Sequence, residues 1–204
     1  MKKRARLDIH VHTSPGSGCS SLGVESYLRA MEMLGVSTVC VTNHGDMADY
    51  RRLVRLAPAG TTVTPGVEIS SPEGDFLLFS ADIAFLETLS PVQDLPARRD
   101  RPAGTAVVWA HPFAGIRGGL AVTDSHVQGV AGRVDGIEVF NGNWPDAQAS
   151  GRAEEIAAHY GLARLGGSDS HRRRQLFRCW TEVEEGTLAE AILRRKTSAR
   201  RGQQ

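Results

Sequence analysis

Two pairs of ligand-type side chains stand two residues apart at the ends of apolar runs. His10 and His12 occur in LDIHVHTSP, and Asp169 and His171 occur in LGGSDSH. Residues i and i+2 of a β-strand point to the same side, so each pair would leave its strand end together. Imidazole and carboxylate groups are typical ligands of zinc, manganese or iron. The two pairs therefore predict a metal site.

Single ligand-type residues have the same placement in other apolar runs. His44 ends VSTVCVTNH, Glu68 lies in GVEIS, and His111 ends AVVWAH. Glu138 lies in GIEVFNG, where the alternative is a buried carboxylate that holds the following loop. A lone histidine at a strand end is more often structural than a ligand. Gathering so many ionisable groups without a metal would be costly, however, so the pattern as a whole supports a metal site.

The apolar runs alternate with helical patterns along the chain. We expect strands at 6–12, 36–44, 61–70, 75–81, 106–112, 134–142, 162–170 and 179–184, and helices at 21–35, 46–57, 145–161 and 187–196. This alternation favours an α/β fold with a parallel sheet, either a barrel or a doubly wound sheet. In a parallel barrel the carboxyl ends of the strands converge on one mouth, which would gather the ligand-type residues. His126 and His159 lack this placement and are interpreted as structural.

Composition limits the class of protein. The 204 residues suit one domain, which we expect over 1–196, with a disordered basic tail at 197–204. The formal charge of +1 offers no broad basic surface for a long polyanion, although a local basic patch could still bind nucleic acid. No apolar run is long enough to span a membrane. Three cysteines do not make a disulfide framework, which favours a reducing cytoplasm.

Six motifs resemble, in order, those of the PHP family (polymerase and histidinol phosphatase). They are DIHVHTSP, VTNHGD, GVEIS, AHPF, GIEVFNG and GSDSH, and the resemblance continues through CWTEVEEGTLAEAILRRK. It implies a distorted (βα)7 TIM-like barrel in a single domain. It also implies phosphoester hydrolysis with two or three divalent ions, of manganese, iron or zinc. The extra domains of a replicative polymerase are not seen, so the chain resembles a stand-alone member.

The resemblance also implies ligand roles for the residues in these motifs. His10, His12 and Asp169 would bind a first ion. Glu68 would bridge this ion to a second one, which His111 would also hold.

A third ion would be held by His44 and His171, which without that ion would donate a proton to the leaving alkoxide. The family often has an Asp or His a few residues beyond the first motif. Here the stretch reads HTSPGSGCS, so Gly18 stands near that place without a carboxylate. Cys19 is either a thiolate substitute or a structural loop cysteine. We therefore expect two firmly bound ions and a third that binds weakly or not at all.

Two further positions depart from the family pattern. The family often has a histidine after Glu68, whereas the segment here is GDFLL, which makes Asp75 a candidate ligand of the second ion. A carboxylate there favours manganese or iron over zinc. Asn43 stands where Asp is common, and this would remove an acceptor that orients a ligating imidazole.

The predicted function is hydrolysis of a small phosphomonoester or nucleotide by a bridging hydroxide in a di- or trinuclear site. Arg117 is a candidate phosphate-binding group, as are Arg172, Arg173 and Arg174, because guanidinium binds phosphate in a bidentate manner. The alternative for these arginines is a solvated surface. Two other functions remain open, an amidohydrolase-like hydrolase and a non-catalytic metal-binding module. The sequence leaves the substrate's identity and the oligomeric state open.

Overall fold

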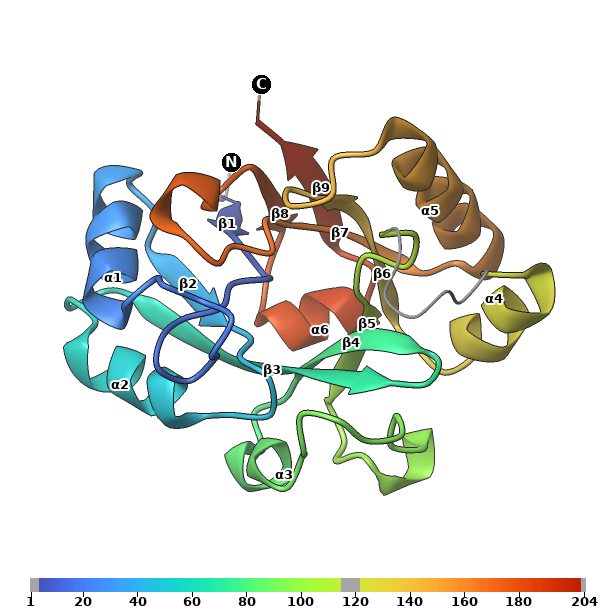
Figure 1. Ribbon diagram of the computed structural model, residues 1–204, viewed down its shortest axis with the longest axis horizontal. Coiled ribbons are helices and arrows are strands. Elements are labelled where there is room, and N and C mark those ends of the chain that lie inside the picture. The colour runs from blue at the N-terminus through green and yellow to red at the C-terminus, as the bar shows by residue number, and fades with distance from the viewer. Residues whose placement is uncertain (1–3, 115–121, 203–204) are drawn as a thin grey trace.

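The strands form one six-stranded and one three-stranded sheet in a computed structural model that describes residues 4–114 and 122–202. The larger sheet has the order β2-β3-β4-β5-β6-β7 and curls around the centre of the molecule, while the smaller one has the order β1-β8-β9 (Figure 1). The strands are β1 (Ala5–Leu7), β2 (Thr38–Val41), β3 (Thr62–Ser71), β4 (Gly74–Phe79), β5 (Ala106–Trp109), β6 (Gly136–Asn141), β7 (Ala163–Gly167), β8 (Cys179–Val183) and β9 (Thr197–Arg201).

Helices cover the outside of the curled sheet. In Figure 1, α1 and α2 lie on one side of the molecule and α4 and α5 on the other. The helices are α1 (Val24–Met33), α2 (Ala48–Leu56), α3 (Ile83–Glu87), α4 (Asp124–Ala131), α5 (Ala147–Tyr160) and α6 (Leu188–Leu193), with short 3-10 turns at η1 (Arg98–Asp100) and η2 (Arg173–Gln175). Among these, α5 begins at the Asp146 cap, whose side chain accepts from Ala149 N, and ends at Gly161 in the left-handed conformation.

Alternation along the strands separates an outer from an inner apolar cluster. In β5, Val107 and Trp109 pack in the outer cluster together with residues of α4 and α5. The residues between them, Ala106 and Val108, pack in the inner cluster with Ile192 of α6. Both faces of the sheet are therefore buried, and α6 fills part of the inner space with apolar side chains.

The sheet is mixed, and this corrects the expectation of a parallel (βα)7 barrel. The α/β class and the single curled domain are confirmed, but β4 pairs antiparallel with both β3 and β5. Only Pro72 and Glu73 separate β3 from β4. A connection this short can join only antiparallel strands, because a parallel pair requires a crossover of a dozen or more residues.

The chain that follows β1 joins the ends of β2 and β7. Thr42 N donates to Val11 O at 2.9 Å, and His12 N donates to Ser170 O at 2.9 Å. Ser170 N in turn donates to His10 O at 3.2 Å. These hydrogen bonds hold the segment that carries His10 and His12 between the carboxyl ends of two strands.

Residues 197–201 are not disordered as expected but form β9. This strand pairs antiparallel with β8 along its whole length, from Thr197 opposite Val183 to Arg201 opposite Cys179. The Arg201 guanidinium also lies over the Phe140 ring, 4.1 Å from its centroid. Backbone pairing and this cation–π contact order a segment that has no apolar pattern of its own.

Within the described residues, no helix has both the length and the apolar character needed to cross a membrane.

Candidate metal centre

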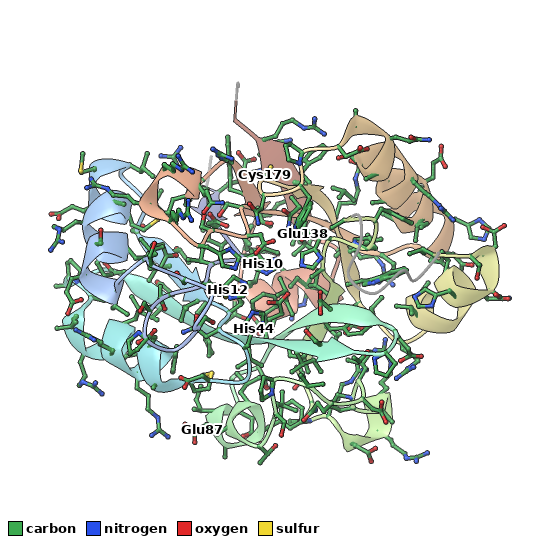
Figure 2. The ribbon with its side chains drawn as sticks, viewed as in Figure 1. His10, His12, His44, Glu87, Glu138 and Cys179 are labelled. Atoms are coloured by element: carbon green, nitrogen blue, oxygen red, sulfur yellow. The ribbon has the colours of Figure 1, made fainter. Side chains whose placement is uncertain are left out.

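The predicted ligands come together at one end of the inner face, near the carboxyl ends of the strands. Figure 2 shows His10, His12 and His44 grouped near the middle of the molecule. The residues brought together are His10, His12, His44, Glu68, Asp75, His111, Asp169 and His171. Glu68 reaches this position because its neighbours in β3, Val67 and Ile69, point into the outer cluster, which leaves Glu68 on the opposite face.

Glu68 is the central side chain of the group. Its Oε1 lies 3.4 Å from Nε2 of His10 and 3.4 Å from Nε2 of His111. Its Oε2 lies 3.2 Å from Nε2 of His12 and 3.1 Å from Nδ1 of His44. Yet Oε2 is buried and accepts no hydrogen bond of acceptable geometry from the part of the chain that the structure describes. Buried polar atoms are normally hydrogen-bonded, so this crowding of nitrogen and oxygen atoms suits ligands of a shared cation.

The imidazole of His10 is held in one tautomer. Its Nδ1 lies 3.3 Å from Oε1 of the buried Glu138, which fixes the proton on Nδ1. Its Nε2 then presents a lone pair and lies only 3.2 Å from Nε2 of His12. A carboxylate behind a ligating histidine is the arrangement that orients imidazoles in metal sites.

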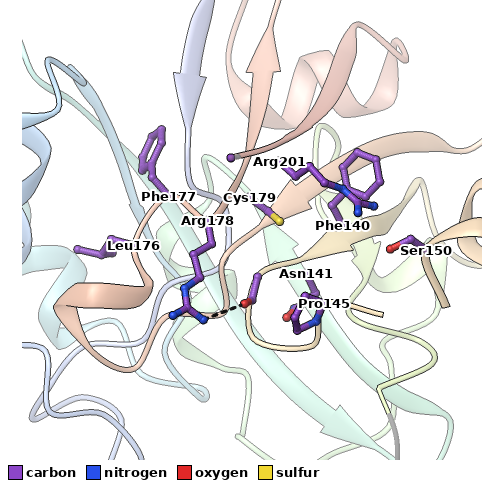
Figure 3. A pocket seen from close by; sticks show the side chains of 11 residues that line it. Phe140, Asn141, Pro145, Ser150, Leu176, Phe177, Arg178, Cys179 and Arg201 are labelled. Carbon is purple, nitrogen blue, oxygen red and sulfur yellow. Dashed lines mark hydrogen bonds between the residues drawn. The ribbon is translucent and has the colours of Figure 1, made fainter. Parts of the chain in front are cut away.

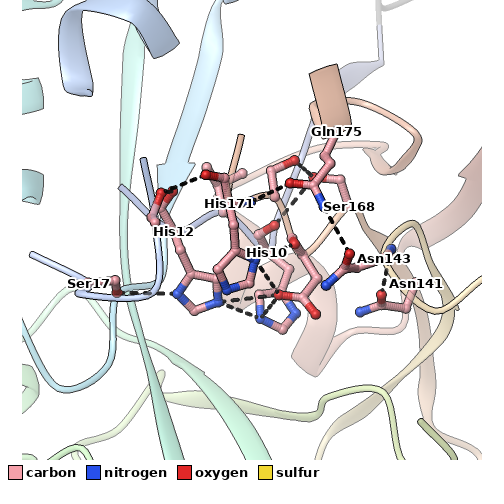
Figure 4. Close-up of polar contacts among 12 residues, drawn as sticks. His10, His12, Ser17, Asn141, Asn143, Ser168, His171 and Gln175 are labelled. Atoms are coloured by element: carbon pink, nitrogen blue, oxygen red, sulfur yellow. Dashed lines mark hydrogen bonds and ion pairs between the residues drawn. The ribbon is translucent and has the colours of Figure 1, made fainter. Parts of the chain in front are cut away.

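His12 has a comparable support on its other ring nitrogen. Its Nδ1 lies 3.3 Å from Ser17 Oγ (Figure 4). The Ser17 hydroxyl in turn donates to Asn43 Oδ1 at 3.0 Å. Ser17 therefore accepts from His12, whose Nε2 is left with a lone pair. Asn43 still supplies an oxygen acceptor, so the acceptor expected to be lost by the replacement of Asp is retained by the amide.

Asp169 and His171 follow β7. Asp169 Oδ1 lies 3.5 Å from His10 Nε2 and 3.4 Å from His12 Nε2. His171 Nδ1 donates to the carbonyl oxygen of Asp169 at 2.9 Å, which leaves Nε2 with the lone pair. This tautomer suits His171 to ligation better than to proton donation.

His111 and Asp75 form the other flank. His111 Nδ1 lies 3.9 Å from Asp75 Oδ2, and the His111 backbone N–H donates to Glu138 Oε2 at 2.9 Å. Asp75 stands opposite Ser70 in the β3–β4 pairing and alternates with outward-facing Phe76, so it faces inward.

The cluster is electrostatically coupled. Burial disfavours the charged form of His10, but nearby carboxylates, first that of Asp169, raise its pKa well above the ordinary imidazole value. Burial likewise opposes ionisation of Glu68, but the charge of His10 holds its pKa well below the usual range. His171 differs, because burial and then the charge of His12 lower its pKa. Without a metal, the centre thus favours ionised carboxylates beside protonated imidazoles. The Nε2 lone pairs of His10 and His12 become available when a bound cation replaces those protons.

The donor atoms fit divalent metal ions. Four sets have ligand atoms within 4.8 Å of one another: His10, His12 and Glu68; His10, His111 and Asp169; Glu68, Asp75 and His111; and His12, Cys19 and His171. Lone pairs on imidazole nitrogens, a shared carboxylate and a buried oxygen without a donor are the properties that such a site requires.

The fold is shared with several solved structures. PsfC from Pseudomonas syringae has a TM-score of 0.72 and 19% identity, covering 98% of this chain and 92% of that chain. A candidate metal-dependent phosphoesterase from Bifidobacterium adolescentis has a TM-score of 0.63 and 15% identity, covering 93% and 96%. An amidohydrolase from Chromobacterium violaceum, with bound sulfate and no metal, has a TM-score of 0.59 and 14% identity, covering 81% and 87%.

No curated protein sequence matches the chain significantly. A family model described as PHP-associated matches residues 148–197, which run from α5 through the loop after His171 to the start of β9. This match covers about a quarter of the chain and supports the predicted resemblance to the PHP family.

Some residues that support the centre carry little sequence signal. Asp8 is buried and accepts from the backbone N–H groups of Ser168 at 2.8 Å and Phe177 at 3.0 Å. Burial raises the pKa of Asp8 to about 6. Gly167 is required because a Cβ there would lie 2.6 Å from His10 Cβ and would also meet Glu138 Oε1. Glycine at 167 therefore lets Glu138 reach His10, and no local sequence pattern predicts this contact.

The arginines predicted to bind phosphate lie in different parts of the chain. Arg117 lies outside the described residues. Arg172, Arg173 and Arg174 directly follow His171 and are exposed. The histidines interpreted as structural lie apart from the cluster, His126 on α4 and His159 on α5.

A cavity of about 440 Å³ lies beside the loop that follows His171 (Figure 3). Arg178 and Arg201 line it, and Arg178 contacts Gly142 O at 3.5 Å. Asn141 lines it as well, and its Nδ2 donates to Glu138 Oε2 at 2.9 Å. The cavity is therefore linked through one amide to the carboxylate that supports His10.

Proposed function

We propose that this protein is a metal-dependent phosphoesterase of the PHP family that hydrolyses a small phosphomonoester or a nucleotide. The observation that carries the proposal is the Glu68 carboxylate, whose oxygens lie within 3.4 Å of four imidazoles while Oε2 accepts no hydrogen bond from the described residues. A carboxylate in this position suits a ligand shared by two ions.

The ligand sets follow from the contacts. His10, His12, Glu68 and Asp169 would hold one ion. Glu68, His111 and Asp75 would hold a second, and the added carboxylate favours manganese or iron there. His44 and His171 would serve a third ion. Bound divalent ions would supply Lewis acidity, which lowers the pKa of a water molecule and neutralises phosphate charge.

The remaining chemistry belongs to the chain itself. Glu138 and Ser17 hold His10 and His12 in the tautomers that direct Nε2 inward. The burial of these groups excludes bulk water and strengthens every electrostatic contact with a bound phosphate. Arg172 to Arg174, next to His171, would bind the phosphate from the open side.

Substrate recognition has a second component at the exposed Trp144. This side chain is 42% exposed and lines the same small cavity as His111 and Glu138. A flat apolar group, such as a nucleobase, would stack on the indole. The proposal is supported further by the solved structure from Bifidobacterium adolescentis, which is named as a candidate metal-dependent phosphoesterase.

The test is release of phosphate by the full chain. Metal-free protein is reconstituted with Mn²⁺, Fe²⁺ or Zn²⁺ and assayed on nucleoside monophosphates and on small sugar and alkyl phosphates. We expect turnover that depends on the metal and is abolished in His10→Ala. His159→Ala is the matched control, because His159 is exposed on α5 and should leave activity unchanged.

Three results would contradict the proposal. Cleavage of oligonucleotides without action on small esters would indicate a nuclease. Cleavage of amides or carboxylic esters, with no inhibition by inorganic phosphate, would indicate an amidohydrolase-like enzyme. Metal binding without turnover on any of these substrates would indicate a binding module.

A further inference from the structure

A group of possible ligands without a carboxylate lies on one flank of the centre. His12, Cys19 and His171 have ligand atoms within 4.8 Å of one another. The sequence pattern left this flank without an acid, because Gly18 stands near the position where an acidic residue was expected. Gly18 itself is exposed, and the space around its Cα is open. The neighbouring thiol is therefore the anionic donor that the loop can bring to this flank.

Hydrogen bonds fix the loop that carries Cys19 against both histidine segments. Ser20 Oγ donates to His12 O at 2.8 Å, and Ser21 N donates to His171 O at 3.0 Å. At the loop's other end, Gly16 N donates to Asp49 Oδ2 at 3.1 Å. Cys19 thus lies on a short segment with hydrogen bonds on both sides, and these bonds keep it near the imidazoles.

The partners of Cys19 present lone pairs, and the flank lies beside an unsatisfied acceptor. His171 donates through Nδ1 to Asp169 O, so its Nε2 can ligate. The His171 ring stacks on His12 with centroids 4.5 Å apart. His12 in turn lies 3.2 Å from the buried Glu68 Oε2, which accepts no hydrogen bond from the described part of the chain. That oxygen is an independent sign that cations belong here.

We propose that Cys19 Sγ and His171 ligate a divalent ion beside His12. The thiol loses its proton to solvent when the ion binds, and the thiolate is the anionic donor among these three ligands. A thiolate and imidazole pair selects zinc or ferrous iron over manganese or magnesium. This inference rests on the metal-binding part of the proposed function but not on the phosphoester substrate.

Cobalt titration of the full metal-free chain tests the inference directly. Co²⁺ bound by a thiolate gives a sulfur-to-metal charge-transfer absorption in the near ultraviolet, whereas imidazole and carboxylate ligands give only weak visible bands. We expect both kinds of absorption in the unmodified chain. In Cys19→Ser the charge-transfer band should disappear while the visible bands remain. Cys19 is exposed, so this variant should fold normally.

The other two cysteines provide matched controls. Cys40 and Cys179 are buried and stand outside the four ligand sets, so Cys40→Ala and Cys179→Ala should keep the charge-transfer band. Visible bands without a charge-transfer band in the unmodified chain would overturn the inference and leave the main centre intact. A charge-transfer band that survives in Cys19→Ser would overturn it as well. Failure to bind cobalt at all would overturn the metal centre itself.

Alkylation gives a second readout that does not depend on cobalt. Zn²⁺ should slow the reaction of Cys19 with iodoacetamide by about tenfold or more, because a ligated thiolate is a poorer nucleophile and is sterically protected. Peptide mass spectrometry would locate the modified cysteine. Equal rates with and without Zn²⁺ would contradict the inference.

Discussion

The two flanks of the metal centre offer different donor atoms around a shared core. One flank, here called the oxygen side, consists of Asp75 and His111. The other, the sulfur side, consists of Cys19 and His171. Carboxylate oxygen suits manganese and iron, whereas thiolate suits zinc and ferrous iron. With the proposed ligands, each flank would select its own ion, and iron is the ion that both flanks would accept.

The flanks also differ in the way that the fold supports them. Asp75 is paired in register with Ser70 within the β3–β4 hairpin, and its side chain is only 11% exposed. Cys19 is exposed on a loop that hydrogen bonds tie to its neighbours. A sheet position fixes a ligand rigidly, whereas a loop position permits a new ligand type without disturbing the core. The proposed thiolate ligand accordingly lies on the loop.

Replacing the shared carboxylate should have the largest effect. Glu68→Gln keeps the size of the side chain but replaces one oxygen with an NH₂ group that cannot ligate. We expect activity to fall by more than the roughly 100-fold that loss of a ligand's supporting hydrogen bond can cost. Elemental analysis should show fewer ions per chain, with Glu32→Gln on the exposed surface of α1 as the control. If only one flank lost its ion, Glu68 would not be shared.

Removing the support behind His10 should have a smaller effect. Glu138→Gln removes the charge that fixes the His10 tautomer, while the amide keeps the shape of the side chain. Metal affinity should fall by about 10- to 100-fold. Calorimetric metal titration measures this, and the melting temperature of the metal-free protein reports whether the fold is intact. An unchanged metal affinity in a folded variant would show that Glu138 only accepts the hydrogen bond of the His111 backbone N–H and does not support the His10 imidazole.

The grouping of the candidate ligands could be predicted because their positions carry a local signal. His10, His12 and Asp169 end apolar runs, and the fold places them within 3.5 Å of one another. The supporting contacts could not be predicted in this way, although Glu138 itself stood out in the sequence as a candidate buried carboxylate. Glu138 reaches His10 across 128 positions of sequence only because Gly167 leaves space. Such contacts depend on packing between distant segments, which periodicity does not reveal.

The fold was predictable to a similar extent. The apolar runs gave the α/β class, but β9 owes its order to pairing with β8, and its own sequence TSARR has no strand pattern. The antiparallel β3–β4 hairpin, in contrast, was within reach, since its turn is too short for a parallel connection. Helix α4 also carried local signals, because Thr123 caps it and Val127, Val130 and Ala131 form an apolar stripe.

A substitution on the oxygen side alone should weaken the binding of one ion. Asp75→Asn removes the charge of a single ligand, so we expect manganese affinity to fall by about tenfold, the lower range for a perturbed metal site. Manganese titration followed by electron paramagnetic resonance would measure the loss. The cobalt–thiolate absorption of the sulfur side should be unchanged. Loss of both signals would mean that the two flanks do not bind independently.

The pKa values of the two flanks should shift in opposite directions in the metal-free protein. Burial opposes the charged form of His111, but Glu68 raises its pKa, whereas burial and the charge of His12 lower the pKa of His171. Nitrogen NMR of the imidazoles against pH should therefore show His171 losing its proton first.

The direction in which stability changes with pH follows from the same pKa shifts. The raised pKa of His111 adds stability that is complete below the unfolded value of about 6.5 and is lost as the pH rises through the folded value. His10 and His12 act in the same direction, and His171 opposes them. The melting temperature of the metal-free protein should therefore fall by a few degrees above neutral pH. A rise in melting temperature would contradict this balance.

The smallest expected effect concerns which flank receives the organic part of the substrate. Trp144 stands beside His111 on the oxygen side, and its backbone N–H donates to Asn141 Oδ1 at 3.0 Å, which fixes the residue at the mouth. Stacking of a base on an exposed indole contributes about 1 kcal/mol, so Trp144→Ala should raise KM for a nucleoside monophosphate about fivefold. The kcat should be unchanged because Trp144 belongs to none of the four ligand sets. The KM for an alkyl phosphate should be unchanged because such a substrate has no ring to stack on the indole. Equal increases for both substrates would mean that the indole only shapes the loop. No increase for either would place the leaving group elsewhere, and the cavity lined by Arg178 would be the next position to test.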